Sequence, residues 1–465
     1  MDENYITMNR IIKKAAIIFL TATVLIFNAS CKKEVEPIPE TDPNPELTKA
    51  KTYLFELMSD VYYWYKDMPK NINAKPITSI YPYFDTLLVS QDRWSWMMSG
   101  ADYLSSETGV YLTYGASYSQ PIEYYNDYGI RVRYIFDNSP LSEKGVKRGY
   151  LLTHLNNTPV MDLVTANTFN STLAQTTNSF TFKDYNGTST TFTATAREVS
   201  TRSALKTMVI RSTDFPNLPY PVGYFHYYSF KAGMLSDIDD AMATFKAANI
   251  QELVLDLRYN GGGDGKATSL LANYISPASA EGKIIARREH NDKLAQYDND
   301  QTTMTIVKRI ANSLDLRRII ILTSKGTASA SEVIINGLKP LMSVIQIGKT
   351  TYGKPNGMYV WFYPEDNQTN PVYVFLPIAF FSVNSVGAGH YENGIVPDHD
   401  RPDDLYHDFG LQEDWLKAAL TFITTGQYPS LPAKSAGVQS LTPYSRISTD
   451  EDSKNYGVYK AERPL

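Results

Sequence analysis

The residues best placed to do chemistry lie in TSKGTASASEVIINGLKP, residues 323–340, where two serines stand two positions apart. A strand-like run precedes them and a run with helical spacing follows, so Ser329 and Ser331 mark a predicted strand-to-helix junction. A serine followed by Glu332 and an apolar run is typical of a helix N-cap. This stretch alone favours the cap, and a nucleophilic serine is the alternative.

Two further loops also follow strand-like runs. LVLDLRYNGGGDG places Asn260 and three consecutive glycines after the predicted strand 253–257. Glycines at a strand end let bare backbone approach a ligand or an anion, and a tight turn that needs positive φ is the alternative. The spacing fits neither nucleotide-binding glycine motif, which excludes that class of site. The other loop, GKTTYGKPNG, presents Lys349 and Lys354 between glycines.

These loops are expected to meet, because the carboxyl ends of parallel strands gather at one edge of a sheet. A lysine there can accept the proton of a serine hydroxyl if burial lowers the pKa of its amine towards neutrality. Such Ser-Lys hydrolases need no histidine. The helix N-terminus beneath Ser329 and a backbone N–H of the glycine turn would then stabilise an oxyanion.

The elements that would hold these loops can be predicted from about residue 205 onward. Val-, Ile- and Leu-rich runs alternate there with helical runs such as MLSDIDDAMATFKAA, and QEDWLKAALTFIT predicts one more helix. This alternation predicts an α/β fold with a mainly parallel sheet covered on both faces. Residues 48–107 predict a small helical N-terminal region, with a helix from about Leu47 that stops at Pro69. Residues 108–200 hold short β-rich runs.

The two ends of the chain predict no packed structure. MNRIIKK followed by AAIIFLTATVLIF and a small-residue stretch before Cys31 resembles a bacterial lipoprotein signal over residues 1–31, with a plain secretory signal as the alternative. Cys31 is the only cysteine, which excludes an intrachain disulfide. Residues 32–47 read as a Pro-rich tether. Residues 426–465 read as a polar tail with no core to join.

The three loops together resemble the carboxyl-terminal processing peptidases, family S41, over roughly residues 50–425. LVLDLRYNGGG, GTASASE, TTYGKPNG and NGIVPD are similar to the segments of that family. The resemblance implies a crotonase/ClpP-like protease core over 201–425, with Ser329 as nucleophile and Lys354, rather than Lys349, as general base. It implies an oxyanion hole formed by the N–H groups of Gly262 and Ala330, and it leaves the cap to Ser331.

One position departs from the family pattern. Many members carry Gln four residues after the lysine, where this chain has Met358. Glu332 and Asn336 are within reach and could substitute for it in orienting the lysine.

The stretch VRYIFDNSPLSEKGVKRGYLLTHLNNTPV resembles a PDZ domain, through Ser139-Pro140, a short helix ending at Gly145, and Arg148-Gly149. A generic small β domain is the alternative. The resemblance implies capture of a peptide by strand addition. The N–H groups of a turn formed by Tyr128, Gly129 and Ile130 would face the terminal carboxylate.

Other functions are disfavoured by the sequence. The net charge is −5 without a basic cluster, so no nucleic-acid partner is expected. The six histidines are scattered, and PDHDRPDDLYHD lacks ligand spacing from a second element, so neither a metal nor a cofactor is expected. Asp256 and Arg258 are expected to form a structural ion pair.

The sequence thus predicts an exported, lipid-anchored serine endopeptidase of the cell envelope. It would cleave proteins or peptides engaged through their C-termini. The alternatives are a peptide-binding lipoprotein with an inactive protease-like core, and an acyl-CoA enzyme on the same α/β core.

Overall fold

The computed structural model describes residues 44–124, 127–431 and 458–460. The predicted signal segment, Cys31 and most of the predicted tether lie outside these ranges. Within the described ranges, no helix has both the length and the apolar character that crossing a bilayer requires.

A six-stranded sheet forms the centre of the core, and the strands that bear the site all run in one direction. Neighbouring strands pair in parallel throughout, except that β11 is antiparallel to β12. The order is β11 (Ala204–Ile210), β12 (Val222–Tyr227), β13 (Glu252–Asp256), β17 (Arg318–Thr323), β18 (Ser343–Gly348) and β23 (His399–Asp400). The predicted mainly parallel α/β sheet is confirmed.

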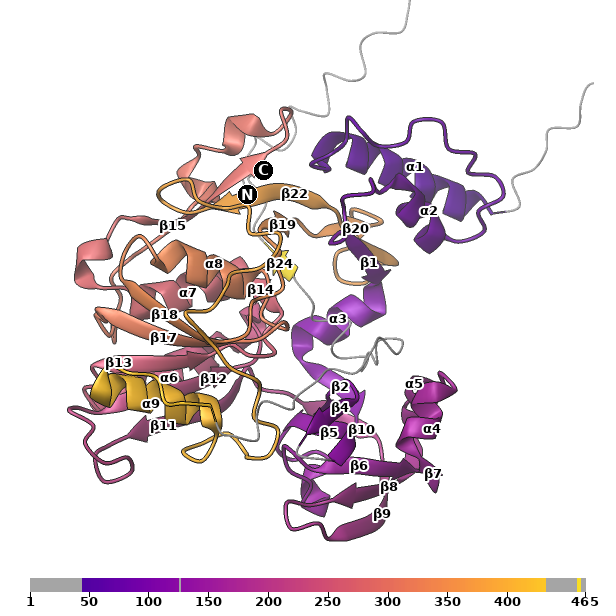
Figure 1. The fold of residues 1–465 in the computed structure, drawn as a ribbon. Coiled ribbons are helices and arrows are strands. Elements are labelled where there is room, and N and C mark those ends of the chain that lie inside the picture. The colour runs from indigo at the N-terminus through magenta and orange to yellow at the C-terminus, as the bar shows by residue number, and fades with distance from the viewer. Residues whose placement is uncertain (1–43, 125–126, 432–457, 461–465) are drawn as a thin grey trace, which may run out of the picture. The chain divides into compact units, whose positions relative to one another are not determined.

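Helices cover both faces of this sheet, as Figure 1 shows. Successive residues of a strand point to opposite faces, so Leu255 and Ile321 pack in the cluster formed with α6–α8, whereas Val254 and Ile320 pack with Trp415 of α9. Burial on both faces explains why these strands read as continuous apolar runs. The helices are α6 (Leu235–Ala247), α7 (Gly265–Ile275), α8 (Ala330–Leu338) and α9 (Asp414–Thr425).

A second six-stranded sheet joins distant parts of the chain. Its order is β14 (Gly262–Asp264), β24 (Val458–Lys460), β19 (Asn356–Met358), β22 (Ile378–Val383), β15 (Ile284–His290) and β16 (Thr305–Ile306). The expectation that the tail joins no core is therefore wrong at residues 458–460. A strand can join a sheet through backbone hydrogen bonds alone, without the apolar period on which the expectation rested.

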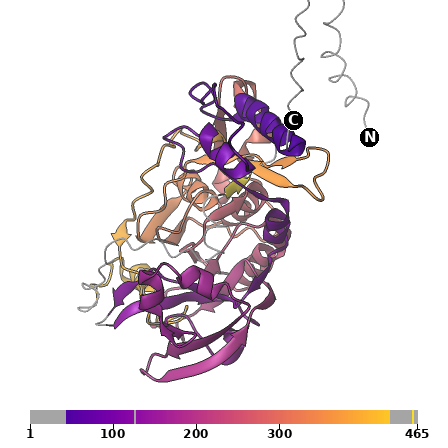
Figure 2. The same cartoon turned by 90° about the vertical axis from the view of Figure 1, so that its right-hand side faces the viewer.

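The N-terminal region is helical but contains a strand as well. It comprises α1 (Pro45–Val61), α2 (Ile80–Leu87), β1 (Trp96–Ser99) and α3 (Gly100–Thr108). The predicted helix to Pro69 ends at Val61, and the next residue, Tyr62, donates its N–H to Met58 O at 3.1 Å and its hydroxyl to Asp92 at 2.7 Å. Figure 2 shows α1 and α2 against the hairpin of β20 (Trp361–Tyr363) and β21 (Tyr373–Leu376), and β21 pairs with β1.

Residues 110–200 form the predicted β-rich region, with an apolar cluster of its own. A 3₁₀ turn, Ser142–Lys144, ends at Gly145 in the left-handed conformation, as expected. The strands are β2 (Val110–Thr113), β3 (Ala116–Tyr118), β4 (Ile122–Tyr124), β5 (Asp127–Ile135), β6 (Leu151–Leu155), β7 (Thr158–Pro159), β8 (Thr177–Lys183), β9 (Ser189–Thr195) and β10 (Arg197–Ser200), with short helices α4 (Val160–Thr165) and α5 (Phe169–Leu173). The PDZ likeness stays a prediction.

Candidate active site

Ser329 stands at the N-cap of α8 with a backbone conformation that L-residues seldom adopt. Its φ is 57° and its ψ is −113°, outside the regions that sterics favour. The side chain is fully buried, and its Oγ has no hydrogen-bond partner among the described residues. Strain and an unsatisfied buried hydroxyl both cost stability, and such features cluster at functional sites.

The carboxylate of Glu332 links the serine loop to the lysine loop. Glu332 is buried, and burial raises the pKa of its carboxyl group while four donors oppose the rise. Its oxygens accept hydrogen bonds from Ser329 N (2.8 Å), Thr351 Oγ1 (2.5 Å), Gly353 N (2.7 Å) and Lys354 N (2.8 Å). One side chain therefore fixes the backbone of both candidate catalytic residues.

Lys354 is buried without a partner for its amine. It is 1% exposed, and Nζ makes no hydrogen bond to any described residue. Burial lowers the pKa of Lys354 to about 7, against the opposing charges of Asp92 and Glu332. Lys349 differs, because its side chain is 40% exposed and its amine pairs with Asp400 at 2.7 Å. Lys354 therefore has an amine that can accept a proton near neutral pH.

The glycine turn lies directly against the serine loop. A Cβ atom built on Gly262 would lie 2.9 Å from Ser329 Cβ and 2.9 Å from Ala330 N, so no other residue fits here without movement. The φ of Gly262 is 104°, as a turn that needs glycine requires. Its N–H donates to Asn260 Oδ1 at 2.9 Å, while Asn260 Nδ2 donates to Tyr227 O at 2.8 Å. The expected oxyanion donors are thus adjacent, and one is held by a side chain.

The predicted role of Ser331 as the helix cap is wrong. The helix begins at Ala330, which puts Ser329 at the N-cap and Ser331 inside the first turn. The hydroxyl of Ser331 is buried and donates to Asn260 O at 3.0 Å. Ser331 therefore ties the glycine turn to α8, a contact that spans 71 residues of sequence.

The late turn NGIVPD holds the lysine loop from the other side. Ile395 N donates to Thr351 Oγ1 at 2.7 Å, and Thr351 N donates to Ile395 O at 3.1 Å. Asp398 then fixes the turn to β18 by accepting from Gln346 N at 2.7 Å. The two loops are so close that a Cβ on Gly353 would lie 2.2 Å from Glu392 O. These contacts fix the backbone of the lysine loop on the side opposite Glu332.

Met358, which stands at the position of the family's Gln, and Asn336, one of the two suggested substitutes, have separate tasks. Met358 is fully buried in an apolar cluster with Trp94 and Leu376, so its side chain serves packing. Asn336 donates to Ala388 O at 2.7 Å and accepts, through its backbone carbonyl, from Asn384. Glu332 is the candidate that contacts the lysine loop.

The sequence analysis missed Asp92. Its charge acts on Lys354, and its Oδ1 accepts from the backbone N–H groups of Trp94 and Ser95, each at 2.9 Å. Arg93 in the same loop donates to Gly353 O at 3.2 Å. The only sequence signal was the stretch QDRWSW, in which an acidic and a basic residue precede two tryptophans. It did not indicate which loop this stretch would contact.

The segment Tyr128–Ile130 does not form the predicted turn. All three residues lie inside β5, where Tyr128 and Gly129 are opposite residues of β4 and Ile130 is opposite Leu152 of β6. The turn needed to present several N–H groups to one carboxylate is therefore not formed.

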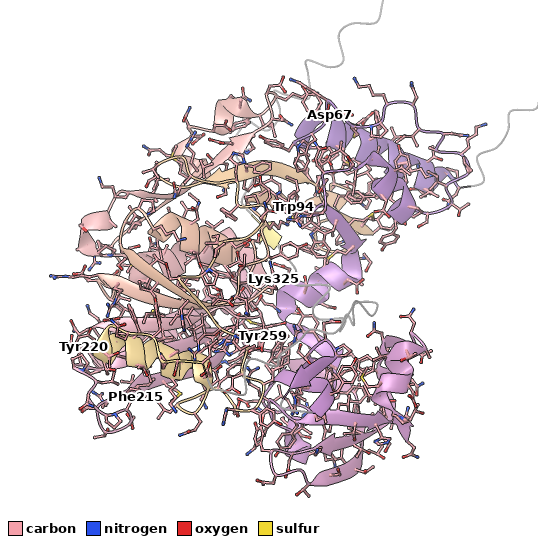
Figure 3. The ribbon with its side chains drawn as sticks, in the orientation of Figure 1. Asp67, Trp94, Phe215, Tyr220, Tyr259 and Lys325 are labelled. Carbon is pink, nitrogen blue, oxygen red and sulfur yellow. The ribbon has the colours of Figure 1, made fainter. Side chains whose placement is uncertain are left out.

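Asp256 and Arg258 form the expected structural ion pair. Both are fully buried, with Arg258 Nε 3.0 Å from each Asp256 oxygen. Arg258 also donates to Glu413 at 2.6 and 2.9 Å and to Asp403 at 2.9 Å. Asp403 also accepts a hydrogen bond from Arg148 of the β-rich region at 2.8 Å. The hydroxyl of Tyr259 (Figure 3) accepts a hydrogen bond from Arg148 and donates one to Asp403.

The described ranges contain no group of three His, Cys, Asp or Glu side chains that could hold a metal ion. His399 stacks on Tyr428, with ring centroids 4.2 Å apart, and His407 contacts Asp404 at 2.7 Å.

Comparisons with known proteins place these loops in a family. The model of peptidase family S41 matches residues 221–400, and the model of the peptidase S41 N-terminal domain matches residues 49–96. The chain is 31% identical over 133 residues to carboxyl-terminal-processing peptidase 2, chloroplastic, of Arabidopsis thaliana, covering 29% of this chain and 24% of that one. It is 29% identical over 140 residues to a carboxy-terminal-processing protease of Bartonella bacilliformis, covering 29% of each.

These matched segments span less than a third of the curated relatives' length. A crystal structure from Bacteroides fragilis, described as that of an S41 protease, has 24% identity and a TM-score of 0.66. The alignment covers 81% of this chain and 97% of that one, which shows a shared fold.

Proposed function

This chain belongs to peptidase family S41, and on that premise we propose that it is a serine endopeptidase with Ser329 as nucleophile and Lys354 as general base. The observation that carries the proposal is the state of Lys354: its amine is buried and unpartnered, and its pKa is lowered to about 7. A neutral amine is a proton acceptor, and the fixing of both residues by Glu332 supplies the positional order that such a pair needs.

The proposed reaction has two steps. Ser329 Oγ attacks the scissile carbonyl while Lys354 Nζ takes the hydroxyl proton, and the amine product leaves with that proton as the acyl-enzyme forms. A water molecule then attacks the ester, again giving its proton to Lys354, and the carboxylate product and free Ser329 are released. The protein needs no cofactor for either step.

The proposed oxyanion hole comprises the N–H groups of Ala330 and Gly262. Ala330 N is the first amide of α8, where the helix dipole favours negative charge. The N–H of Gly262 must exchange its bond to Asn260 Oδ1 for one to the substrate oxygen. Loss of one such donor typically costs about 100- to 1000-fold in rate.

Substrate capture and anchoring complete the proposal. The β-rich region would act as a PDZ-like domain that binds the C-terminal end of a protein or peptide, and the ion pair between Arg148 and Asp403 attaches it to the core. Lipidation at Cys31 would hold the exported chain on a membrane of the cell envelope. Membrane retention of a Cys31→Ala chain would contradict the anchor.

The test uses the full chain purified in detergent and a denatured model protein as substrate. Wild type, Ser329→Ala and Lys354→Met are compared, with Lys349→Met as the matched control because Lys349 is exposed and paired. We expect cleavage by wild type and Lys349→Met and none by the other two. Cleavage that survives Ser329→Ala or Lys354→Met would overturn the assignment. Peptide binding without cleavage by any form would favour a binding protein with an inactive core.

A further inference from the structure

The C-terminal segment of the chain lies beside the proposed oxyanion turn as a strand. β24 pairs in parallel with β14, with Val458 opposite Gly262 and Lys460 opposite Asp264. Lys460 is also the parallel partner of Met358 in β19. Figure 1 shows β24 between these two strands, which come from different loops of the site.

β14 and β19 leave room for one strand between them. The other edge of β14 is taken by Phe230, whose N–H donates to Gly262 O at 3.0 Å and whose carbonyl accepts from Asp264 N at 2.7 Å. The other edge of β19 pairs with β22. Paired strands lie about 4.8 Å apart, so a single extended chain fills this gap and bonds to both edges. Without such a chain, backbone donors and acceptors of both edges would lack strand partners.

The gap runs past the reacting groups. Gly262, which would meet Ser329 Cβ at 2.9 Å if it carried a Cβ, forms one wall. β19 begins two residues after Lys354 and forms the other wall. An extended chain in this gap therefore lies between the nucleophile loop and the base loop, where a peptide must lie to be cut.

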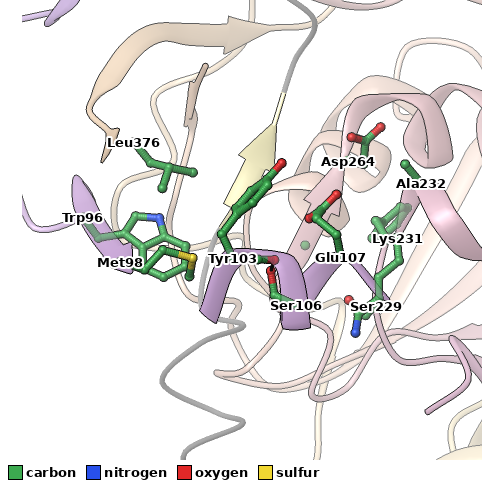
Figure 4. A pocket seen from close by; sticks show the side chains of 13 residues that line it. Trp96, Met98, Tyr103, Ser106, Glu107, Ser229, Lys231, Ala232, Asp264 and Leu376 are labelled. Carbon is green, nitrogen blue, oxygen red and sulfur yellow. Dashed lines mark hydrogen bonds between the residues drawn. The ribbon is translucent and has the colours of Figure 1, made fainter. Parts of the chain in front are cut away.

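A pocket that is partly open to solvent adjoins β14. Its lining includes the apolar side chains of Trp96, Met98 and Leu376, and the charged side chains of Glu107 and Lys231 (Figure 4). Alternate side chains of a strand point to opposite faces, so one face of a bound strand could deliver side chains towards this pocket. The mixed lining fits a polypeptide ligand better than a purely apolar one.

We propose that the gap between β14 and β19 is the strand-binding site for the polypeptide substrate, and that the chain's own residues 458–460 occupy it in competition with substrate. That the bound polypeptide is a substrate rests on the proposed function, whereas the binding of an extended peptide in this gap does not. Backbone bonds hold the occupant, which explains how a polar tail without an apolar period can enter the core. Tethering to the same chain raises the effective concentration of the tail, so even weak pairing competes.

The first test measures peptide binding in the uncleaving Ser329→Ala background. The probe is a fluorescent peptide of residues 452–465 with an amidated C-terminus, which has no carboxylate for a PDZ-like site. The double variant Val458→Pro/Tyr459→Pro removes two N–H donors and is incompatible with a paired strand. We expect it to bind the probe at least about tenfold more tightly than the parent. Lys460→Ala, which keeps the backbone, is the control and should bind like the parent. Equal affinity in all three would overturn the proposal.

A second measurement locates the site. Amide hydrogen exchange at Gly263 and at residues 356–358 should become faster in the double-proline variant, return towards the parent rate when the probe is added, and stay unchanged in Lys460→Ala. Unchanged exchange in the double-proline variant would overturn the proposal.

Hydrolysis then separates this proposal from the proposed function. With Ser329 restored, we expect the double-proline variant to cleave denatured protein at least about tenfold faster than wild type at limiting substrate. Cleavage that both forms perform equally would overturn the strand site and keep the peptidase. Probe binding and exchange as expected, with no cleavage by any form, would keep the strand site and overturn the peptidase.

Discussion

Two buried basic residues, Arg258 and Lys354, follow strands β13 and β18 of the same sheet, and they differ in the partners of their side chains. The guanidinium of Arg258 contacts three carboxylates, those of Asp256, Asp403 and Glu413. Among the described residues, no carboxylate lies within hydrogen-bonding distance of the Lys354 amine. Burial is nearly complete for both, so the difference lies in the partners and in the chemistry of the two groups.

The comparison shows how the same burial can serve structure or chemistry. A guanidinium cannot lose its proton in a protein, so Arg258 must be paired, and its partners link β13, α9 and the Asp403 loop. An amine can lose its proton, so Lys354 escapes the cost of a buried charge by becoming neutral. Arg258, which is buried with its partners, therefore has a structural role, whereas Lys354, whose buried amine has none among the described residues, is suited to act as a general base.

The largest expected effect is on activity. Ser329→Ala and Lys354→Met should each lower kcat/KM for protein cleavage by about 10⁴-fold or more, because removing either member of such a pair disables the whole unit. Lys354→Met should not lower the free energy of unfolding, since it replaces a buried amine that bonds to no described residue with an apolar side chain. Steady-state kinetics and urea denaturation measure the two quantities. A strongly destabilised Lys354→Met chain would show that the lysine is structural, like Arg258.

Arg258→Met should give the reverse pattern. It leaves Asp256 and Glu413 buried without their cation, so we expect the free energy of unfolding to fall by about 3–5 kcal/mol. The exposed pair Lys349–Asp400 provides the control, because Lys349→Met should cost less than about 1 kcal/mol. Urea denaturation of both variants is the measurement. An equal loss of stability in the two variants would mean that burial does not make the Arg258 ion pairs more costly to break than the exposed Lys349–Asp400 pair.

Met358→Gln tests whether the family's usual residue would orient Lys354 here. Met358 is fully buried among apolar side chains, so an amide in its place would lack partners and cost about 1–3 kcal/mol of stability. Met358→Leu keeps the apolar contact and should cost less. If Met358→Gln instead raised kcat at unchanged stability, Lys354 would be incompletely oriented in this chain.

The smallest expected effect follows pH. The base form of Lys354 requires a neutral amine, so kcat/KM should fall about tenfold per pH unit below a pKa of about 7 and level off above it. A pH profile on an uncharged peptide substrate measures this. A profile that keeps rising to pH 10 would mean that the amine retains its ordinary pKa.

The same pKa makes a linked prediction for stability. Between about pH 7 and the ordinary lysine value near 10.4, the unfolded chain binds one more proton than the folded chain, so the free energy of unfolding should rise with pH. The difference in slope between wild type and Lys354→Met isolates this contribution. Identical slopes would contradict a lowered pKa.

Much of the site could be predicted because its parts are local. The serine loop, the glycine turn and the lysine loop each follow a strand-like run, and parallel strands bring such loops to one edge. The contacts that the sequence did not reveal are long-range: Asp92 acts on Lys354, and Ser331 reaches back to Asn260. Spacing carries no information about these contacts, because they depend on how separate elements pack.

Two errors have the same origin. The Tyr128–Ile130 segment contains a glycine and was interpreted as a turn, but pairing with β4 and β6 extends it. The polar tail has no apolar period and was expected to join nothing, but residues 458–460 fill a gap between two strand edges. In both cases backbone hydrogen bonding to distant strands overrode the local pattern.

The sequence by itself determined the alternation of strands and helices, the two covered faces of the main sheet, and the residue types at the strand ends, because side-chain period and turn chemistry are local properties. Only the tertiary structure decided which lysine is neutral, which carboxylate joins the loops, and what lies beside the glycine turn. The pKa of a lysine depends on the water that its neighbours exclude, and the packing of separate elements leaves Lys354 only 1% exposed.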